Sequence, residues 1–283
     1  MPKHYEALQR AEEERRRKVA GVDSSVPAAV PFETAASPQA PPAAKPPGLL
    51  GRLFRGRREA SVEEPGEANK RRIALLQPDS YVAEQYRSLR GRIDSLASQR
   101  PLKTLAVTSA NSGEGKSTCS VNLASVTAMS VGRSVLLIDC DLRRPKVHWT
   151  LGLQPQVGLA EVLLNQATVD EAIQKLDGVN LDVLPVRSVP SNPSELLASP
   201  EMRKLCEEVA GRYDRVILDT PACLGLPDAK SVSELCDGLV MVVRAGVTPK
   251  EEVQAALDIL DRRKVVGLVL NGSEATREQY GYY

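Results

Sequence analysis

From about residue 80 onward, short apolar runs alternate with amphipathic segments along the chain. The apolar runs have the length of strands and cover residues 105–108, 134–141, 181–185, 214–221, 237–243 and 265–272. Segments with helical spacing lie before and between them, at residues 80–98, 121–127, 157–176, 193–211, 228–236 and 249–263. Because apolar strands that alternate with helices are buried on both faces, the pattern predicts an α/β fold with a doubly wound, mostly parallel sheet.

The segment at residues 80–98 opens this region as a predicted helix, with Ser80 as its N-cap. Four apolar residues at helical spacing should face the core, namely Tyr86, Leu89, Ile93 and Leu96. Glu84, Arg87 and Arg90 follow one another at three-residue steps, so they should cluster on one side of the helix. Taken alone, an ordinary charged, solvent-facing surface explains such a cluster equally well.

The first 78 residues have a different composition. Residues 22–48 are rich in Pro, Ala and Ser, so they cannot bury enough apolar surface to offset the entropy cost of ordering. Residues 48–58 mix leucine and phenylalanine with arginine, which suits either a lipid or partner surface or a basic patch of a disordered arm. We therefore expect a disordered arm at residues 1–78, a folded domain at 79–271 and a flexible tail at 272–283.

A glycine-rich loop joins the first predicted strand to the helix that follows it. Residues 109–118 read SANSGEGKST, and strand, loop, Gly-Lys-Ser and helix in this order are typical of a P-loop, the phosphate loop of an NTPase fold. Backbone N–H groups around Gly113 and Gly115 can surround phosphate oxygens. Lys116 adds a positive charge, and the Ser117 hydroxyl can bind Mg²⁺. The loop residues expected to hold the nucleotide are Gly113, Glu114, Gly115, Lys116, Ser117 and Thr118.

Polar residues end three of the other predicted strands. Asp139 and Asp141 end the second strand, and period-two alternation should point both side chains the same way. Asp219 and Asn271 end two later strands, and ligands bind beyond the carboxyl ends of parallel strands. We expect Asp141 and Asp219 to hold Mg²⁺ through water and Asp139 to accept a proton, although the sequence leaves the roles of Asp139 and Asp141 exchangeable. Asn271 is a candidate for contact with the nucleotide base.

The chain ends in a cluster of tyrosines. Tyr280, Tyr282 and Tyr283 have no core pattern around them, which indicates an exposed tail with a function. The last predicted strand delivers this tail to the edge of the sheet that carries the acids. The residues after Asn271 can extend about 40 Å, which is enough to reach the site of a neighbouring subunit.

Composition argues against several classes of partner and site. The chain of 283 residues has a formal net charge of +1, which argues against a nucleic-acid partner. Its five cysteines form no CxxC pair and its two histidines are too few for a histidine metal cluster, so neither a disulfide framework nor a zinc site is expected. There is no run of 18 apolar residues and no signal-peptide core, so we expect a cytoplasmic protein.

In combination, these motifs resemble those of the bacterial tyrosine kinases (BY-kinases), specifically the separate cytoplasmic kinases of capsule and exopolysaccharide export systems. The resemblance covers about residues 78–283, where SANSGEGKST is similar to Walker A, LLIDCDLRRP to Walker A′ and VILDTP to Walker B. It implies an ATP- and Mg²⁺-dependent protein-tyrosine kinase that phosphorylates the tyrosine tails of neighbouring copies. The catalytic residues that it implies are Lys116, Asp139, Asp141 and Asp219, and the phosphoacceptors are Tyr280, Tyr282 and Tyr283.

The resemblance also implies partners. EQYRSLRGR matches the E-x-x-R-x-x-R helix that mediates ring assembly in the family, which implies this role for Glu84, Arg87 and Arg90. Because the kinase is not fused to a membrane protein, a separate transmembrane activator, the polysaccharide co-polymerase, is implied. This activator would recruit the kinase to the inner face of the cell membrane and link it to polysaccharide polymerisation and export. Other tyrosine-containing proteins are further candidate substrates.

Two other functions fit parts of the sequence. One is an ATPase switch of the ParA/MinD type, but those proteins carry an extra lysine early in the P-loop, where this chain has Asn111. The tyrosine tail also has no role in such a switch. The other is a non-catalytic, nucleotide-binding regulator of the export machinery, and the complete set of lysine, serine and acids argues against it.

Overall fold

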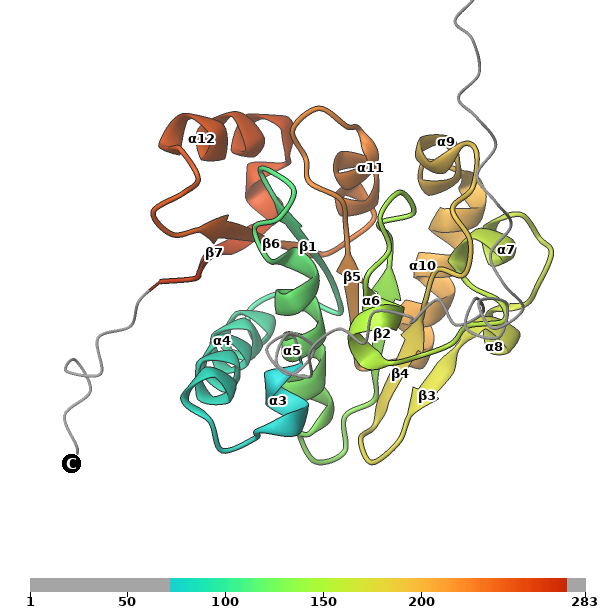
Figure 1. Ribbon diagram of the computed structural model, residues 1–283, viewed down its shortest axis with the longest axis horizontal. Coiled ribbons are helices and arrows are strands. Elements are labelled where there is room, and N and C mark those ends of the chain that lie inside the picture. The colour runs from blue at the N-terminus through green and yellow to red at the C-terminus, as the bar shows by residue number, and fades with distance from the viewer. Residues whose placement is uncertain (1–71, 274–283) are drawn as a thin grey trace, which may run out of the picture. The chain divides into compact units, whose positions relative to one another are not determined.

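A computed structural model of the protein describes residues 72–273. Seven strands in this range form one sheet in the order β3-β4-β2-β5-β1-β6-β7 (Figure 1). The strands are β1 (Thr104–Ser109), β2 (Val135–Asp139), β3 (Gln174–Leu176), β4 (Leu181–Leu184), β5 (Arg215–Asp219), β6 (Gly238–Arg244) and β7 (Val265–Asn271). Only the β3–β4 pair is antiparallel, so the expected mostly parallel sheet is confirmed.

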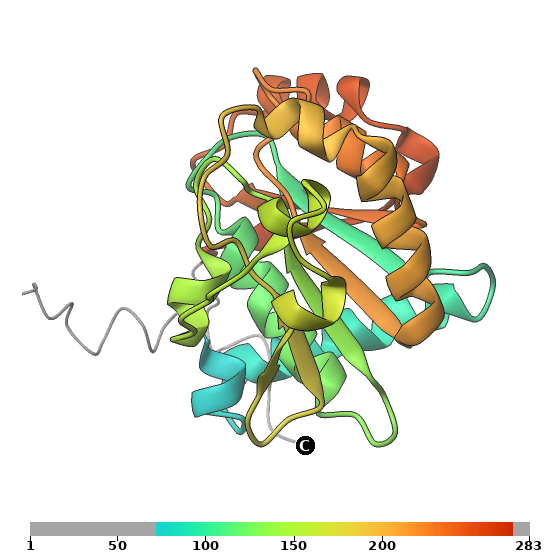
Figure 2. The same cartoon turned by 90° about the vertical axis from the view of Figure 1, so that its right-hand side faces the viewer.

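Helices cover both faces of this sheet, as expected for strands that are apolar on both sides. They are α3 (Ile73–Leu76), α4 (Tyr81–Ala97), α5 (Lys116–Ala128), α6 (Val147–Leu151), α7 (Leu159–Leu163), α8 (Val169–Ala172), α9 (Pro193–Leu197), α10 (Pro200–Arg212), α11 (Asp228–Glu234), α12 (Lys250–Ile259) and the 3₁₀ helix η2 (Arg262–Lys264). Helices α3, α4, α5 and α6 pack on one face of the sheet in one apolar cluster. The helices from α7 through α12 pack on the other face in a second cluster. Figure 2 shows α3 and α4, in cyan, on the opposite side of the sheet from α10 and α12.

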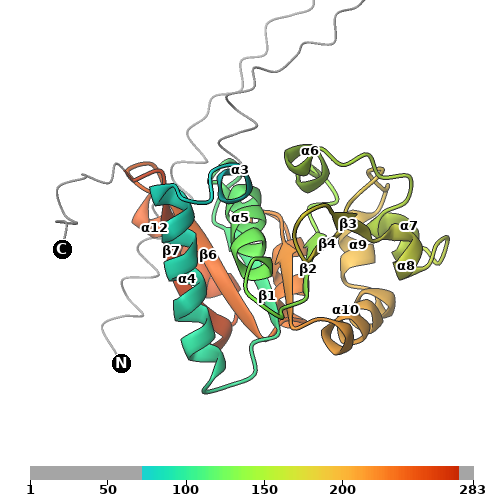
Figure 3. The same ribbon diagram turned by 90° about the horizontal axis from the view of Figure 1, so that it is seen from below.

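Helix α4 forms much as its sequence predicts. The Ser80 hydroxyl accepts a hydrogen bond from the backbone N–H of Ala83, at 3.2 Å, and caps the helix. Ile93 is buried, and the three other apolar residues of the predicted stripe pack partly buried against the same cluster. Helix α4 therefore lies beside α5, the helix that follows the phosphate loop (Figure 3).

Two predicted helices are interrupted in the structure. The one expected at 157–176 is divided into α7, α8 and the edge strand β3, with Asn165 in the left-handed region at φ 56° between the two helices. The one expected at 193–211 breaks before Pro200, since a proline disfavours helical geometry in the residue that precedes it. Ser199 then caps α10 by accepting the N–H of Met202, at 3.2 Å.

Two short helices, α3 and α6, were not predicted. Helix α3 lies within the arm expected at 1–78, and its Ala74 is fully buried and donates its N–H to the side chain of Asn122, at 2.9 Å. Ordered structure thus begins before the predicted domain boundary. The remainder of the arm and its basic segment at 48–58 lie outside the described residues. Within residues 72–273, no helix is both long and apolar enough to cross a bilayer.

Candidate nucleotide and phosphoryl-transfer site

The phosphate loop lies at the carboxyl edge of the sheet, between β1 and α5. Gly113 and Gly115 have φ angles of 87° and 97°, in the left-handed region that favours glycine, and Gly115 is the N-cap of α5. The loop forms one wall of a pocket of about 240 Å³. The pocket is lined by Ser112, Gly113, Gly115, Lys116, Ser117, Thr118, Asp141, Arg144, Lys146 and Thr150. Backbone amides, a helix N-terminus and three cationic side chains therefore surround a space suited to phosphate groups.

Glu114 lies in the same loop, but its side chain is buried outside the pocket. Its carboxylate accepts hydrogen bonds from the backbone N–H of Asn111, at 3.2 Å, and from the Thr248 hydroxyl, at 2.6 Å. The side-chain amide of Asn111 donates to Glu252 on α12, at 2.5 Å. Only the backbone of Glu114 is available to a nucleotide. Asn111, which replaces the lysine of ParA/MinD-type loops, does not line the pocket.

Asp219 ends β5 directly beneath the start of α5. It is fully buried, and one carboxylate oxygen accepts the Ser120 hydroxyl, at 3.0 Å. Burial raises the pKa of Asp219 to about 6, although the neighbouring Ser117 hydroxyl and the charge of Lys116 oppose this rise. Its other oxygen, Oδ2, is buried and has no hydrogen-bond donor among the described residues.

This oxygen gives a test of whether the site fits Mg²⁺. Mg²⁺ binds oxygen ligands, and it usually keeps several waters and takes the rest from one or two carboxylates and substrate phosphates. The Ser117 hydroxyl lines the pocket, and the unpaired Oδ2 of Asp219 is buried behind it, beside the first turns of α5, from where it can act through water. Within residues 72–273, no group of three or more His, Cys, Asp or Glu side chains is arranged to hold a metal by itself. The residues therefore fit an ion that arrives with a nucleotide.

Asp139 is the register partner of Asp219 on the neighbouring strand, and it is fully buried. Its carboxylate accepts three backbone N–H groups, from Asp141 at 3.1 Å, Lys146 at 3.1 Å and Val147 at 3.0 Å. Burial and the nearby charge of Asp219 raise the pKa of Asp139 well above its usual value, against the effect of these hydrogen bonds. In this conformation Asp139 holds the loop after β2 and does not face the pocket.

Asp141 lies on that loop and lines the pocket. The expectation that Asp139 and Asp141 point the same way is wrong, because β2 ends at Asp139 and strand alternation does not continue past it. Arg144 and Lys146 extend from the same loop into the pocket wall, and within residues 72–273 neither side chain forms an ion pair. Arg143 instead pairs with the buried Asp228, at 2.7 Å.

Asn271 ends β7 and reaches the phosphate loop. Its side-chain Nδ2 donates to the carbonyl oxygen of Glu114, at 2.9 Å. The expected position beside the nucleotide site is therefore observed, while contact with a base stays a prediction. The chain then continues toward Tyr280, Tyr282 and Tyr283, which lie outside the described residues.

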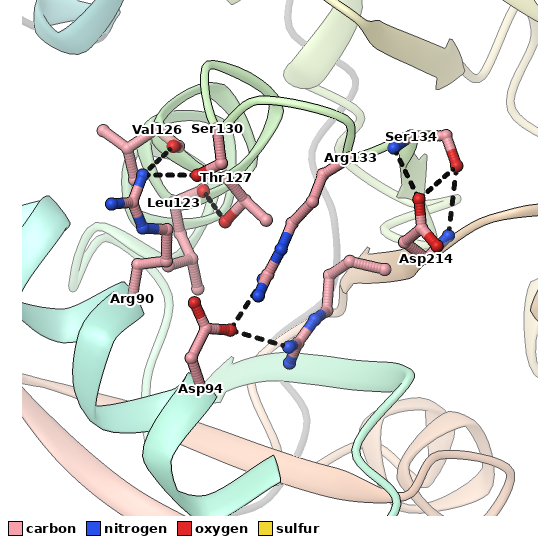
Figure 4. A network of polar contacts seen from close by, with 10 residues as sticks. Arg90, Asp94, Leu123, Val126, Thr127, Ser130, Arg133, Ser134 and Asp214 are labelled. Carbon is pink, nitrogen blue, oxygen red and sulfur yellow. Dashed lines mark hydrogen bonds and ion pairs between the residues drawn. The ribbon is translucent and has the colours of Figure 1, made fainter. Parts of the chain in front are cut away.

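The three charged residues of α4 have different surroundings, and Figure 4 shows those of Arg90. Glu84 pairs with Arg87 on the helix surface, at 2.8 Å. Arg90 points inward and donates to the Val126 carbonyl, at 2.6 Å, and to the Ser130 hydroxyl, at 2.7 Å, at the C-terminal end of α5. Arg90 thus contacts its own subunit in this structure, and a role of the three residues in assembly stays a prediction.

Several residues of the site were not predicted. Lys146 and Thr150 line the pocket, and the loop is supported by Arg244 at the end of β6, Thr248 and Glu252 in α12. Lys146 lies only five residues after Asp141, so the Walker A′-like segment could have indicated it. Thr248 and Glu252 had no motif, because their contact with the loop depends on how β6 and α12 pack.

Comparison with known proteins adds to this geometry. A family model described as an AAA domain matches residues 102–257, which include the phosphate loop and all three acids. Tyrosine-protein kinase YwqD of Bacillus subtilis (strain 168) is 42% identical over 214 residues, which cover 75% of this chain and 90% of that protein. Succinoglycan biosynthesis transport protein ExoP of Rhizobium meliloti (strain 1021) is 32% identical over 231 residues, covering 75% of this chain and 29% of that protein. The solved kinase domain of Escherichia coli tyrosine kinase ETK superimposes with a TM-score of 0.67 at 33% identity, covering 75% of this chain and 84% of that one.

Proposed function

Since this chain belongs to the bacterial tyrosine kinase family, we propose that it transfers the γ-phosphoryl group of ATP to tyrosines in the C-terminal tails of neighbouring copies. One observation carries this proposal. Strand β7, whose end contacts the phosphate loop through Asn271, leads directly into the segment that contains Tyr280, Tyr282 and Tyr283. The acceptor tyrosines are thereby attached close to a nucleotide pocket.

The pocket supplies the charges that such a transfer requires. Lys116 and the loop amides hold the β- and γ-phosphates from one side, and Arg144 and Lys146 face them from the other. Mg²⁺, held by Ser117 and through water by Asp219, would neutralise charge on these phosphates. The tyrosine oxygen forms a bond to the γ-phosphorus as the bond to the β,γ-bridging oxygen breaks, and ADP leaves.

The tyrosine must also lose its proton, because a free phenol has a pKa of about 10. We expected Asp139 to accept this proton, but its carboxylate would first have to leave the N–H groups of Lys146 and Val147. Asp141 already faces the pocket and needs no such movement. We therefore assign proton acceptance to Asp141 and the support of its loop to Asp139.

The same family membership suggests the cellular role. ExoP is named as a transport protein of succinoglycan biosynthesis, and this chain matches 29% of its length. We propose that this kinase acts with a separate transmembrane activator, which recruits it to the inner face of the cell membrane. Self-association of the kinase in a ring would bring each tail to the next pocket, and cycles of tail phosphorylation would regulate polysaccharide polymerisation and export.

Mass analysis of the intact protein after incubation with ATP-Mg tests the transfer. Wild-type protein, with and without the cytoplasmic segment of a candidate membrane partner, is compared with Lys116→Met and with a Tyr280/Tyr282/Tyr283→Phe variant. We expect phosphotyrosine on the wild-type tail and none on either variant alone. Consumption of ATP with no phosphate on protein, even with the partner, would instead support a switch ATPase.

Mixing the two variants tests transfer between subunits. The Lys116→Met chain keeps its tyrosines but lacks the phosphate-binding lysine, and the phenylalanine variant keeps the lysine but lacks acceptors. Phosphate on the Lys116→Met chain in the mixture shows transfer between copies. If the wild type, which has both Lys116 and the tail tyrosines, becomes phosphorylated and the mixture does not, transfer occurs within one subunit.

A further inference from the structure

The side-chain amide of Asn271 packs directly on the backbone of the phosphate loop. Nδ2 lies 2.9 Å from the carbonyl oxygen of Glu114. A Cβ atom built on Gly115 would lie 1.9 Å from the same nitrogen and 3.1 Å from Cγ of Asn271. No side chain therefore fits between the end of β7 and this part of the loop.

This hydrogen bond fixes the direction of a peptide group. In a trans peptide the C=O and the N–H point in opposite directions within one plane. The carbonyl of Glu114 and the N–H of Gly115 belong to the same peptide group. When Asn271 holds that carbonyl outward, the N–H of Gly115 is directed toward the pocket that Gly115 lines.

Neighbouring contacts keep the donor in place. The backbone carbonyl of Asn271 accepts the N–H of Ala245, at 2.9 Å, so the end of β7 is fixed to the end of β6. Arg244 donates to the carbonyl of Gly113, at 3.4 Å. That carbonyl shares a peptide group with the N–H of Glu114, so Arg244 sets the direction of this N–H as Asn271 sets that of Gly115. The Thr248 hydroxyl holds the Glu114 side chain.

We propose that Asn271 is a positioning residue that sets the phosphate-binding amides of the loop, rather than a residue that reads the base. Nucleotides with different bases should then depend on Asn271 equally, since the effect reaches them through their phosphates. The inference rests on the proposed nucleotide site. Strand β7, which leads to the tyrosine tail, is thereby joined through Asn271 to the part of the phosphate loop that would bind the phosphates of ADP, the leaving group of the transfer.

The test uses the full chain and three probes, ADP-Mg, GDP-Mg and inorganic tripolyphosphate. Dissociation constants are measured by calorimetry for wild type, Asn271→Ala and Asn271→Leu, which is similar in size and uncharged but lacks the donor. Asn180→Ala is the matched control, because Asn180 Nδ2 also donates to a backbone carbonyl, that of Arg133 at 2.7 Å, away from the pocket lining. The amide signal of Gly115 in ¹H–¹⁵N spectra reports its hydrogen bond to phosphate directly.

Loss of one hydrogen bond of this kind should weaken all three probes together by about three- to tenfold in both Asn271 variants, with the ADP/GDP ratio unchanged. The shift of the Gly115 amide on ADP addition should shrink, and Asn180→Ala should bind as wild type. A variant that loses ADP affinity but keeps tripolyphosphate affinity would show a base contact and overturn the proposal, as would unchanged affinity for all probes. Wild-type protein that binds tripolyphosphate but forms no phosphotyrosine would count against the kinase mechanism and not against this inference.

Discussion

Asp139 and Asp141 are two residues apart, yet only Asp141 reaches the phosphate pocket, while Asp139 is buried and holds the N–H groups of Lys146 and Val147. Mutation of Asp139 should therefore mainly reduce stability, and mutation of Asp141 should mainly reduce activity. Asp139 supports the loop on which Asp141 lies, and Asp141 supplies the carboxylate that a substrate can contact. The pair is therefore a suitable first target for mutation.

Asp139→Ala should lower the free energy of unfolding by about 2–3 kcal/mol, because buried backbone N–H groups lose their acceptor. Asp141→Ala should lower it by no more than about 1 kcal/mol, because the exposed N–H of Arg144 that its carboxylate accepts can bind water instead, yet it should abolish transfer to tyrosine. Urea titrations and phosphotyrosine measurements on the same samples separate the two effects. Equal destabilisation by both substitutions would contradict the division of roles.

Asp219→Asn should stabilise the nucleotide-free protein at pH 7 while it prevents transfer. The pKa of Asp219 rises from 3.8 to about 6 through burial, so keeping the group ionised costs the folded state about 3 kcal/mol at neutral pH. Between pH 4 and 6 the folded state binds more protons than the unfolded state, so the wild type gains stability from this group as the pH falls. We expect the stability difference between Asp219→Asn and wild type to be largest above pH 6 and to disappear near pH 4.

Thermal unfolding without nucleotide or Mg²⁺ at several pH values measures this difference. Asp258→Asn is a suitable control, because Asp258 is an exposed acid on α12 that pairs with Arg262 of η2. A lower melting temperature of Asp219→Asn at pH 7 would instead show that the folded protein stabilises the buried charge.

Gly115→Ala should impair both stability and nucleotide binding, for two separable reasons. The φ of 97° is strained for alanine, and the new Cβ would collide with Nδ2 of Asn271. We expect a loss of about 1–3 kcal/mol in the free energy of unfolding. In the double variant with Asn271→Ala the collision is absent and the strain remains, so the two losses should be less than additive.

Additive losses in this double-mutant cycle would show that the collision contributes nothing. Gly113→Ala offers a comparison within the same loop. Gly113 has a φ of 87° but no atom within 4 Å of a built Cβ, so only the strain applies there.

Asp94→Ala should be among the more destabilising changes on α4. One oxygen of Asp94 accepts from Arg133 at 2.7 Å and from Arg215 at 3.0 Å (Figure 4). The Arg215 side chain is only 6% exposed, burial lowers its pKa, and Nε and Nη1 have no acceptor among the described residues. Removal of its counter-ion leaves a buried charge unpaired, which costs about 3 kcal/mol.

Arg87→Ala is the control on the same helix, because the exposed pair of Arg87 with Glu84 contributes at most about 1 kcal/mol and the exposed Pro78 carbonyl that Arg87 also contacts can bind water instead. Sedimentation of both variants with ATP-Mg tests assembly at the same time. A loss of association in Arg87→Ala, with stability unchanged, would assign the surface pair to the interface between subunits.

The sequence alone determined the class of fold and the identity of most site residues, since both are local properties of the chain. Apolar runs that alternate with helical patterns specify a parallel sheet, and the order of strand, glycine loop, Lys116 and Ser117 specifies a phosphate site. The cap at Ser80 and the core stripe of α4 were predictable for the same reason. The break before Pro200 is also a local property, because a proline disfavours helical geometry in the residue before it, whereas the break at Asn165 has no local signal of that strength.

Only the tertiary structure decided which of those residues line the pocket and which support the loops around it. The strand order places β2, β5 and β1 side by side, so three distant motifs meet at one edge. The end of β2 at Asp139, and not periodicity, sends Asp141 to the pocket and Asp139 into the core. Asn271 could be recognised as a strand end from the sequence, but its hydrogen bond to Glu114 could not. That contact depends on the packing of β7 against β6, across more than 150 residues of chain, and packing over such separations leaves no periodic mark in the sequence.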